Sequence, residues 1–110
     1  MEHKKIEIDG DKIRVSFDNI CDGLMIGKKA GLSPVAETKD EPLQCFAIHE
    51  EGGVWHWANA VIDGDTVVVS SPEIKKPDAV RYAFSGNPDK ANLYNRNGFP
   101  AFPFRTDNDD

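Results

Sequence analysis

The sequence has no apolar run that approaches the roughly 20 residues a helix needs to cross a bilayer. Its N-terminus is charged and has no apolar signal region, so we expect the chain either to stay where it is made or to be an internal fragment. Basic residues occur in pairs rather than clusters, and the formal net charge is −6. We expect no nucleic-acid partner, because a protein that binds nucleic acid must neutralise phosphates with clustered lysine and arginine. We also expect no membrane partner, because no segment is long and apolar enough to span a bilayer.

Residues that hold metals are scarce and poorly spaced. Cys21 and Cys45 are the two cysteines, and their spacing fits no metal-ligand motif. The sequence leaves open whether they form a disulfide or stay as two free thiols. His49 and His56 lie at equivalent ends of a predicted hairpin and could face each other, but the spacing supplies no third ligand. We therefore predict no metal site and no cofactor.

Helical periodicity is almost absent, whereas apolar residues alternate with polar ones in several short segments. The first two such segments cover residues 6–8 and 12–18 and are joined by Asp9-Gly10. The same device returns at Asp63-Gly64, where a β-branched run follows. An Asp-Gly step between alternating segments is typical of a tight hairpin with glycine at positive φ. We therefore predict two hairpins of the same kind.

The middle of the chain is less regular. Glycines and prolines interrupt residues 19–42, where we expect one brief strand over residues 23–27 and otherwise a long loop. Apolar residues then become frequent again, and the sequence predicts a strand over residues 43–49 and a returning strand over residues 54–62.

The returning strand carries both tryptophans of the chain. Trp55 and Trp57 share one side of it, and His56 and Ala58 share the other. Two aromatic rings in line resemble a platform on which sugar rings stack. The other interpretation is that the two rings cover the sheet or meet a neighbouring domain, and we favour this second interpretation.

The C-terminal part joins a strand to an apolar tail, residues 87–107. Val80, Tyr82 and Phe84 fall on one side of an extended segment, as expected for a strand with one buried face. The prolines of the tail are expected to prevent ordinary strand pairing. Burying one phenylalanine is worth roughly 1.5–3 kcal/mol, so we expect the tail's rings to pack against the sheet or against a partner. The candidate docking residues are Tyr94, Phe99, Phe102, Phe104 and Arg105.

Together these segments predict an all-β fold. With 110 residues the chain is long enough for a single two-layer domain, and the many short strands favour an antiparallel β-sandwich. Pattern alone does not separate an immunoglobulin-like topology from a jelly roll. We favour the immunoglobulin-like topology because the strands are few and the chain is short.

Several blocks of the sequence resemble the end of the sialate O-acetylesterases, enzymes that remove acetyl groups from sialic acids. The blocks are Asp65 to Pro77, Ala79 to Ala83, Asn92 to Asn95, Gly98, Pro100-Ala101 and Pro103 to Asp107. The resemblance reaches back to residues 12–17 and covers most of the chain. Residues 25–42 match poorly.

Two motifs of that family are missing from this sequence. In the family the nucleophilic serine lies in a Gly-Gln-Ser-Asn motif and the general-base histidine in an Asp-x-x-His-Pro motif, both in an upstream SGNH-type hydrolase domain. Neither motif occurs in this chain, so we predict no catalytic residue and no esterase activity for the chain alone. The resemblance implies a non-catalytic C-terminal domain that packs against that hydrolase domain in a periplasmic or extracellular parent enzyme.

The alternative function belongs to a different class. If Trp55 and Trp57 lie side by side on an open face, the chain is an autonomous carbohydrate-binding module. A broad exposed patch built partly from the tail instead favours docking to another domain.

Overall fold

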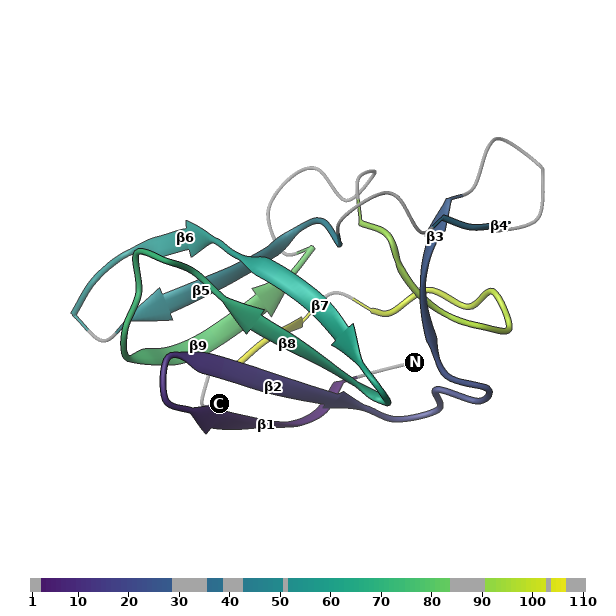
Figure 1. The fold of residues 1–110 in the computed structure, drawn as a ribbon, viewed down its shortest axis with the longest axis horizontal. Coiled ribbons are helices and arrows are strands. Elements are labelled where there is room, and N and C mark those ends of the chain that lie inside the picture. Colours follow the sequence, from purple (N-terminus) through teal and green to yellow (C-terminus); the bar gives the residue numbers. More distant parts are fainter. Residues whose placement is uncertain are drawn as a thin grey trace.

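The computed structural model describes residues 3–28, 36–38, 43–50, 52–83, 91–102 and 104–106. The strands are β1 (His3–Asp9), β2 (Lys12–Phe17), β3 (Leu24–Lys28), β4 (Ala36–Glu37), β5 (Phe46–Glu50), β6 (Trp55–Trp57), β7 (Asn59–Asp63), β8 (Thr66–Ser70), β9 (Pro77–Tyr82), β10 (Leu93–Asn95) and β11 (Phe104–Arg105). Two four-stranded sheets have the orders β1-β2-β8-β7 and β11-β9-β5-β6, and a smaller sheet has the order β10-β3-β4 (Figure 1).

All the strand pairs of these sheets are antiparallel, and the described residues contain no helix. No segment among them is therefore a helix long and apolar enough to span a membrane. The predicted all-β class and the antiparallel β-sandwich are confirmed, and the immunoglobulin-like topology stays a prediction.

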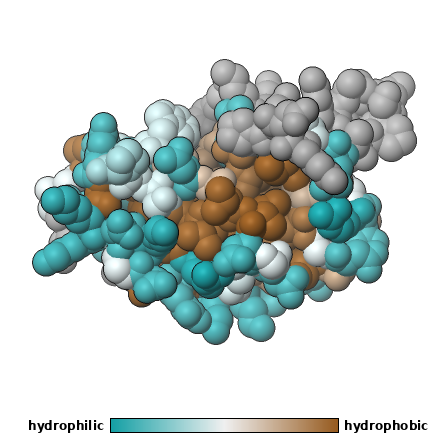
Figure 2. All heavy atoms as spheres, in the orientation of Figure 1, coloured by the Kyte–Doolittle hydropathy of each residue, from teal (hydrophilic) through white to brown (hydrophobic). Residues whose placement is uncertain are grey.

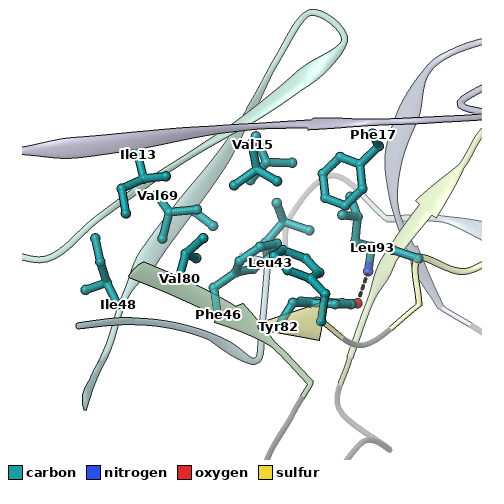
Figure 3. Close-up of a cluster of buried hydrophobic side chains, with 14 of the residues drawn as sticks. Ile13, Val15, Phe17, Leu43, Phe46, Ile48, Val69, Val80, Tyr82 and Leu93 are labelled. Atoms are coloured by element: carbon teal, nitrogen blue, oxygen red, sulfur yellow. Dashed lines mark hydrogen bonds between the residues drawn. The ribbon is translucent and has the colours of Figure 1, made fainter. Parts of the chain in front are cut away.

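The two four-stranded sheets enclose one apolar core. Ile13 and Val15 of β2 lie opposite Ile48 of β5 and Val80 of β9, and Val69 of β8 lies between them (Figure 3). All five side chains are fully buried. In the space-filling view, apolar residues also show in the middle of the molecule, with hydrophilic residues along its lower edge and at its ends (Figure 2). In β2 the apolar residues of the alternating sequence pattern are thus the ones that point into the core.

Both predicted hairpins are present. The first joins β1 to β2 and the second joins β7 to β8, with the last paired residues at Asp9↔Lys12 and Asp63↔Thr66. In each hairpin the glycine is the first of two loop residues and has positive φ, 62° at Gly10 and 60° at Gly64. Glycine at this position is the requirement of a type II′ turn. The aspartate before each glycine therefore ends a strand and lies outside the two-residue loop.

The single returning strand over residues 54–62 is wrong. β6 pairs with β5 in one sheet, whereas β7 pairs with β8 in the other. The chain changes sheets at Ala58, whose N–H donates to the carbonyl of Phe46 at 3.0 Å. The alternation of apolar and polar residues continues through such a corner, because it shows which side chains are buried. It does not show which strand pairs with the segment. Trp57 and Val61 therefore belong to different sheets.

Two further boundaries differ from the prediction. The strand predicted over residues 43–49 begins at Phe46, because Cys45 has a left-handed φ of 71° that a strand does not accommodate. The predicted strand near residues 23–27 is confirmed as β3, and β4 lies in the region predicted as loop. Val80 and Tyr82 are buried on one side of β9 as predicted, whereas Phe84 lies outside the described residues.

The tail does form strands, against the prediction. β10 pairs with β3 and β11 pairs with β9. Both strands are very short. β10 lies between Pro88 and Pro100 in the sequence and β11 follows Pro103, so neither strand contains a residue without an N–H. An isolated bridge, Tyr94↔Pro100, folds the intervening segment back on β10.

Candidate functional site

Large aromatic side chains reach the surface in two places. We call the first the tail groove: Asn19, Cys21, Asn95, Phe99, Pro100 and Phe102. We call the second the tryptophan face: Ala47, Trp55, Trp57, Arg81 and Arg105. In Figure 1, β6 lies at the upper left and the yellow-green tail segment lies at the right, so the two surfaces are on different parts of the molecule.

The tail groove is a shallow apolar hollow of about 250 Å³. Two of its rings are among the most exposed apolar side chains of the described residues, Phe99 at 61% and Phe102 at 51%. The thiol of Cys21 is free and exposed in the same hollow. Burying such rings is favourable, so a surface that presents them together is suited to contact with another apolar surface.

Asn95 shapes one wall of the tail groove. Its side chain is 1% exposed, and its Oδ1 accepts hydrogen bonds from the N–H groups of Asn97 and Phe99, each at 3.0 Å. Its Nδ2 donates to the carbonyl of Asn19 at 3.2 Å. The backbone N–H of Asn95 donates to the carbonyl of Phe99 at 2.9 Å. One buried amide therefore closes the turn that presents Phe99 and joins it to the facing loop.

The facing loop has an unusual backbone. Asn19 and Cys21 both have left-handed φ angles, 58° and 53°. Such angles are uncommon for residues with a Cβ and persist where surrounding contacts impose them. Here the backbone N–H of Asp22 donates to Oδ1 of Asn97, and Nδ2 of Asn97 donates to the carboxylate of Asp22, both at 3.3 Å. The two walls of the groove are thus joined by side-chain hydrogen bonds.

Tyr82 connects the tail to the sandwich core. Its phenol oxygen accepts a hydrogen bond from the N–H of Leu93 at 2.9 Å, and both residues are buried (Figure 3). Burial raises the pKa of the Tyr82 phenol well above its usual range, and the hydrogen bond from Leu93 opposes this shift only in part. The phenol is therefore a neutral structural group at physiological pH.

The three tail phenylalanines have different environments. Phe104 is buried and packs edge-on against Phe17, with ring centroids 5.9 Å apart. Phe99 and Phe102 are exposed. Tyr94 is half-buried and lies opposite Met25 of β3. The structure thus brings Phe99 and Phe102 together in the groove, whereas Tyr94 and Phe104 lie outside its lining.

Arg105, the last of the docking candidates, lies on the tryptophan face. The registers Arg105↔Arg81, Arg81↔Ala47 and Ala47↔Trp57 form one row across all four strands of the sheet. Directly opposed residues share a side of the sheet, and the alternate residues Phe46 and Ile48 point into the core. The row therefore lies on the outer side.

The two tryptophans differ within this face. Trp57 is 69% exposed, whereas Trp55 is half-buried between two other side chains. The guanidinium carbon of Arg81 lies 4.3 Å from the centroid of the Trp55 ring, and the His49 ring lies 5.2 Å from it. The two rings do not form one uniform platform, because Arg81 already covers Trp55.

The two histidines do not face each other. His49 is paired with Trp55 and His56 with Ile48, so their side chains lie on opposite sides of the sheet. Nδ1 of His49 lies 2.8 Å from Asp78, and Nδ1 of His56 lies 2.8 Å from Glu73. The carboxylate orients the imidazole in each pair. The described residues contain no group of three side chains suited to a metal.

A second hollow, of about 420 Å³, lies on the outer side of the other large sheet and is lined partly by Lys12, Arg14, Val61 and Asp63. Its arginine is already paired, because a guanidinium nitrogen of Arg14 lies 2.9 Å from Asp63 and 2.7 Å from the Thr66 hydroxyl. Cys21 and Cys45 are not joined by a disulfide in this structure.

Among solved structures, the chain is similar to that of a carbohydrate acetylesterase from Xanthomonas citri, with 38% sequence identity and a TM-score of 0.78. The similarity covers 96% of this chain but only 22% of that enzyme. No protein-family model matches the chain, and no curated protein matches it. The fold thus defines an antiparallel β-sandwich domain. Its relative is a domain-sized part of a carbohydrate acetylesterase.

Sequence reasoning missed two residues that organise these surfaces. Asn95 appeared only as part of a matching block, although the Asn-Arg-Asn-Gly run that it begins is a turn signal. Arg81 alternates with Val80 and Tyr82, which places it on the other side of its strand, but nothing in the sequence indicates that Trp55 lies beside it. Strand pairing alone makes that contact.

Proposed function

We propose that the chain is the non-catalytic accessory domain of a sialate O-acetylesterase, and that it packs against and supports an upstream SGNH-type hydrolase domain of the same polypeptide. The parent enzyme works in the periplasm or outside the cell. One observation carries this proposal. Nearly the whole chain, 96% of it, matches 22% of a carbohydrate acetylesterase at 38% sequence identity. The blocks near the C-terminus that resemble sialate O-acetylesterases narrow the substrate to acetylated sialic acid.

The absence of a catalytic role is supported by the sequence and by the described side chains. The Gly-Gln-Ser-Asn and Asp-x-x-His-Pro motifs are missing. His49 and His56 each contact a carboxylate at Nδ1, and acyl transfer needs a nucleophile within hydrogen-bond reach of a base. Chemistry on an acetyl group would therefore have to come from the rest of the parent enzyme.

The tail groove is the surface we assign to the hydrolase domain. It presents Phe99 and Phe102 on a segment that polar side chains hold in one shape, so little conformational freedom is lost on docking. The matched esterase has more than three quarters of its length outside the similarity, which supplies a partner large enough to cover the groove. An interface within one polypeptide typically buries about 600–1,500 Å², more than this groove alone provides, so neighbouring residues must contribute.

The reading frame gives the first test. A frame that continues upstream of this sequence and encodes both catalytic motifs is expected, and a frame without them contradicts the parentage. The purified chain should release no product from a chromogenic acetyl ester. Turnover that is lost when one of its serines is mutated would show that the chain is itself an esterase.

Thiol labelling in the full polypeptide tests the docking surface. Cys21 lies in the groove and is exposed, whereas Cys45 is half-buried elsewhere and serves as the internal reference. We expect a maleimide to label Cys21 in the isolated chain and to label it at least about tenfold more slowly in the full polypeptide. Phe99→Ser with Phe102→Ser should restore labelling, and Val61→Ser, an equally exposed apolar residue on the other sheet, should not. Equal labelling in the two forms would exclude this docking surface.

A further inference from the structure

We infer that the tryptophan face binds an acidic sugar, a pyranose ring that carries a carboxylate. The inference rests on the proposed function for the choice of a sugar and deepens it by naming a surface of this chain that binds the sugar and the residues that contact it. Trp57 stacks on the sugar ring, Arg81 binds the carboxylate, and Trp55 positions Arg81.

The stacking residue is identified by its exposure. Trp57 is the most exposed large apolar side chain among the described residues, at 69%, although it belongs to a paired strand. Its neighbour across the ladder is Ala47, which is buried and whose methyl side chain is too short to cover the indole. An indole that lies open on a flat sheet offers its face to the apolar side of a pyranose.

The charge partner is identified by its register. Arg81 lies two strands away from Trp57 in the same row, which corresponds to about 10 Å between backbones. Both side chains are long enough to reach inward from that distance. A ligand stacked on Trp57 therefore has its substituents within reach of the guanidinium.

The charge of this row favours an anion. Arg105 lies directly opposite Arg81, and like charges directly opposed across a sheet repel. Within the part of the chain that the structure describes, no carboxylate forms an ion pair with Arg81. A bound carboxylate would accept charge-assisted hydrogen bonds from Arg81.

Trp55 holds the guanidinium ready for this role. The ring of Trp55 is flanked by Arg81 and by His49, and the Asp78 carboxylate fixes the imidazole at 2.8 Å. Stacking on an aromatic ring leaves the edge of a guanidinium free to donate in its own plane. The half-buried tryptophan therefore restricts Arg81 without using its donors.

Titration of the 110-residue chain tests the inference. Tryptophan fluorescence and calorimetry would follow binding of N-acetylneuraminate and of tri-galacturonate, with neutral galactotriose as the matched ligand. We expect saturable binding of at least one acidic ligand at millimolar or tighter affinity, and binding of galactotriose about tenfold weaker. Affinity for the acidic ligand should fall as salt rises from 20 to 500 mM, in line with a shortening Debye length of about 20 to 4 Å.

Substitutions separate the two contacts. Trp57→Ala should abolish binding of both classes of sugar, whereas Arg81→Gln should remove the preference for the acidic ligand and leave weak neutral binding. Arg14→Gln is the control, because it removes the same charge from the other sheet. Absent binding, equal affinity for acidic and neutral ligands, or an equal loss in Arg14→Gln would each overturn the inference. The proposed function is tested separately, by the upstream reading frame and by the labelling of Cys21. A negative binding result would therefore overturn this inference and leave the proposed function standing.

Discussion

The tail groove and the tryptophan face both expose aromatic rings, but the fold holds them in different ways. Trp57 and Arg81 owe their positions to a ladder of backbone hydrogen bonds through β6, β5 and β9. Phe99 and Phe102 lie on a segment where pairing is brief, and the buried side chains of Asn95 and Tyr82 make the connections. A surface on a sheet tolerates changes in its neighbours, because each strand is held at many points. A surface on an irregular segment depends on a few polar contacts.

This difference gives each surface its own vulnerability. Changes in the tail should destroy the groove and leave the tryptophan face largely intact. Changes on the tryptophan face should alter ligand binding and leave the fold unaffected. Four predictions follow this contrast, from the largest expected effect on stability to the smallest.

Truncation after Lys90 should have the largest effect. It removes the fully buried Leu93 and the buried Phe104, and burying each such side chain contributes roughly 1.5–3 kcal/mol. Because about 1 kcal/mol shifts the melting temperature of a domain this size by roughly 4–8 °C, we expect a fall of at least several degrees in calorimetry. An unchanged melting temperature, with fast backbone motion of the tail in the intact chain, would show that the tail is only a linker.

Asn95→Ala should come second. The change removes hydrogen-bond partners of the N–H groups of Asn97 and Phe99 and of the carbonyl of Asn19. Leaving a buried polar group unpaired costs about 1–3 kcal/mol, so we expect a loss of that order in urea unfolding.

The groove should lose its shape in the same variant. Nuclear magnetic resonance shifts of Phe99 and Cys21 should move, whereas those of Trp57 should not. Asn59→Ala, which changes an exposed asparagine of β7, is the control and should cost less. Equal shift changes on both surfaces would contradict the independence of the two regions.

Tyr82→Phe should destabilise the chain by about 1–2 kcal/mol, because the N–H of Leu93 loses its acceptor in a buried site. The variant should also change the pH dependence. Burial raises the pKa of Tyr82 in the folded chain, so the unfolded chain loses this proton first, near pH 10. The contribution of Tyr82 is therefore complete below about pH 10 and is lost as the pH rises above it.

Urea unfolding at pH 8 and at pH 11 measures this effect. The wild-type chain should lose more stability between these pH values than Tyr82→Phe does. Tyr94→Phe, which changes a half-buried ring of the tail, is the control and should behave as the wild type. An identical pH dependence in Tyr82→Phe and the wild type would show that the Tyr82 phenol does not couple to folding.

Trp57→Ala should have the smallest effect on stability, within about 0.5 kcal/mol, because an exposed side chain contributes little to the core. Thermal unfolding followed by circular dichroism measures this effect. A loss above about 1.5 kcal/mol would show that Trp57 covers the sheet, as we favoured from the sequence, and is not free for a ligand.

The sequence by itself determined the parts of this protein that depend on local pattern. Alternation over residues 12–17 gave the buried face of β2, because a strand turns every second side chain to the same side. Gly10 and Gly64 gave the hairpins, because their positive φ angles favour a residue without a Cβ. The missing catalytic motifs are also a property of the sequence alone.

Only the tertiary structure decided which segments become neighbours. The change of sheet at Ala58, the pairing of β11 with β9 and the contact of Arg81 with Trp55 all join residues that are distant in sequence or belong to different sheets. Local periodicity carries no information on such pairings, since the same alternation suits any partner strand. Both candidate surfaces are built from contacts of this kind. Their residues were therefore visible in the sequence, but their grouping was not.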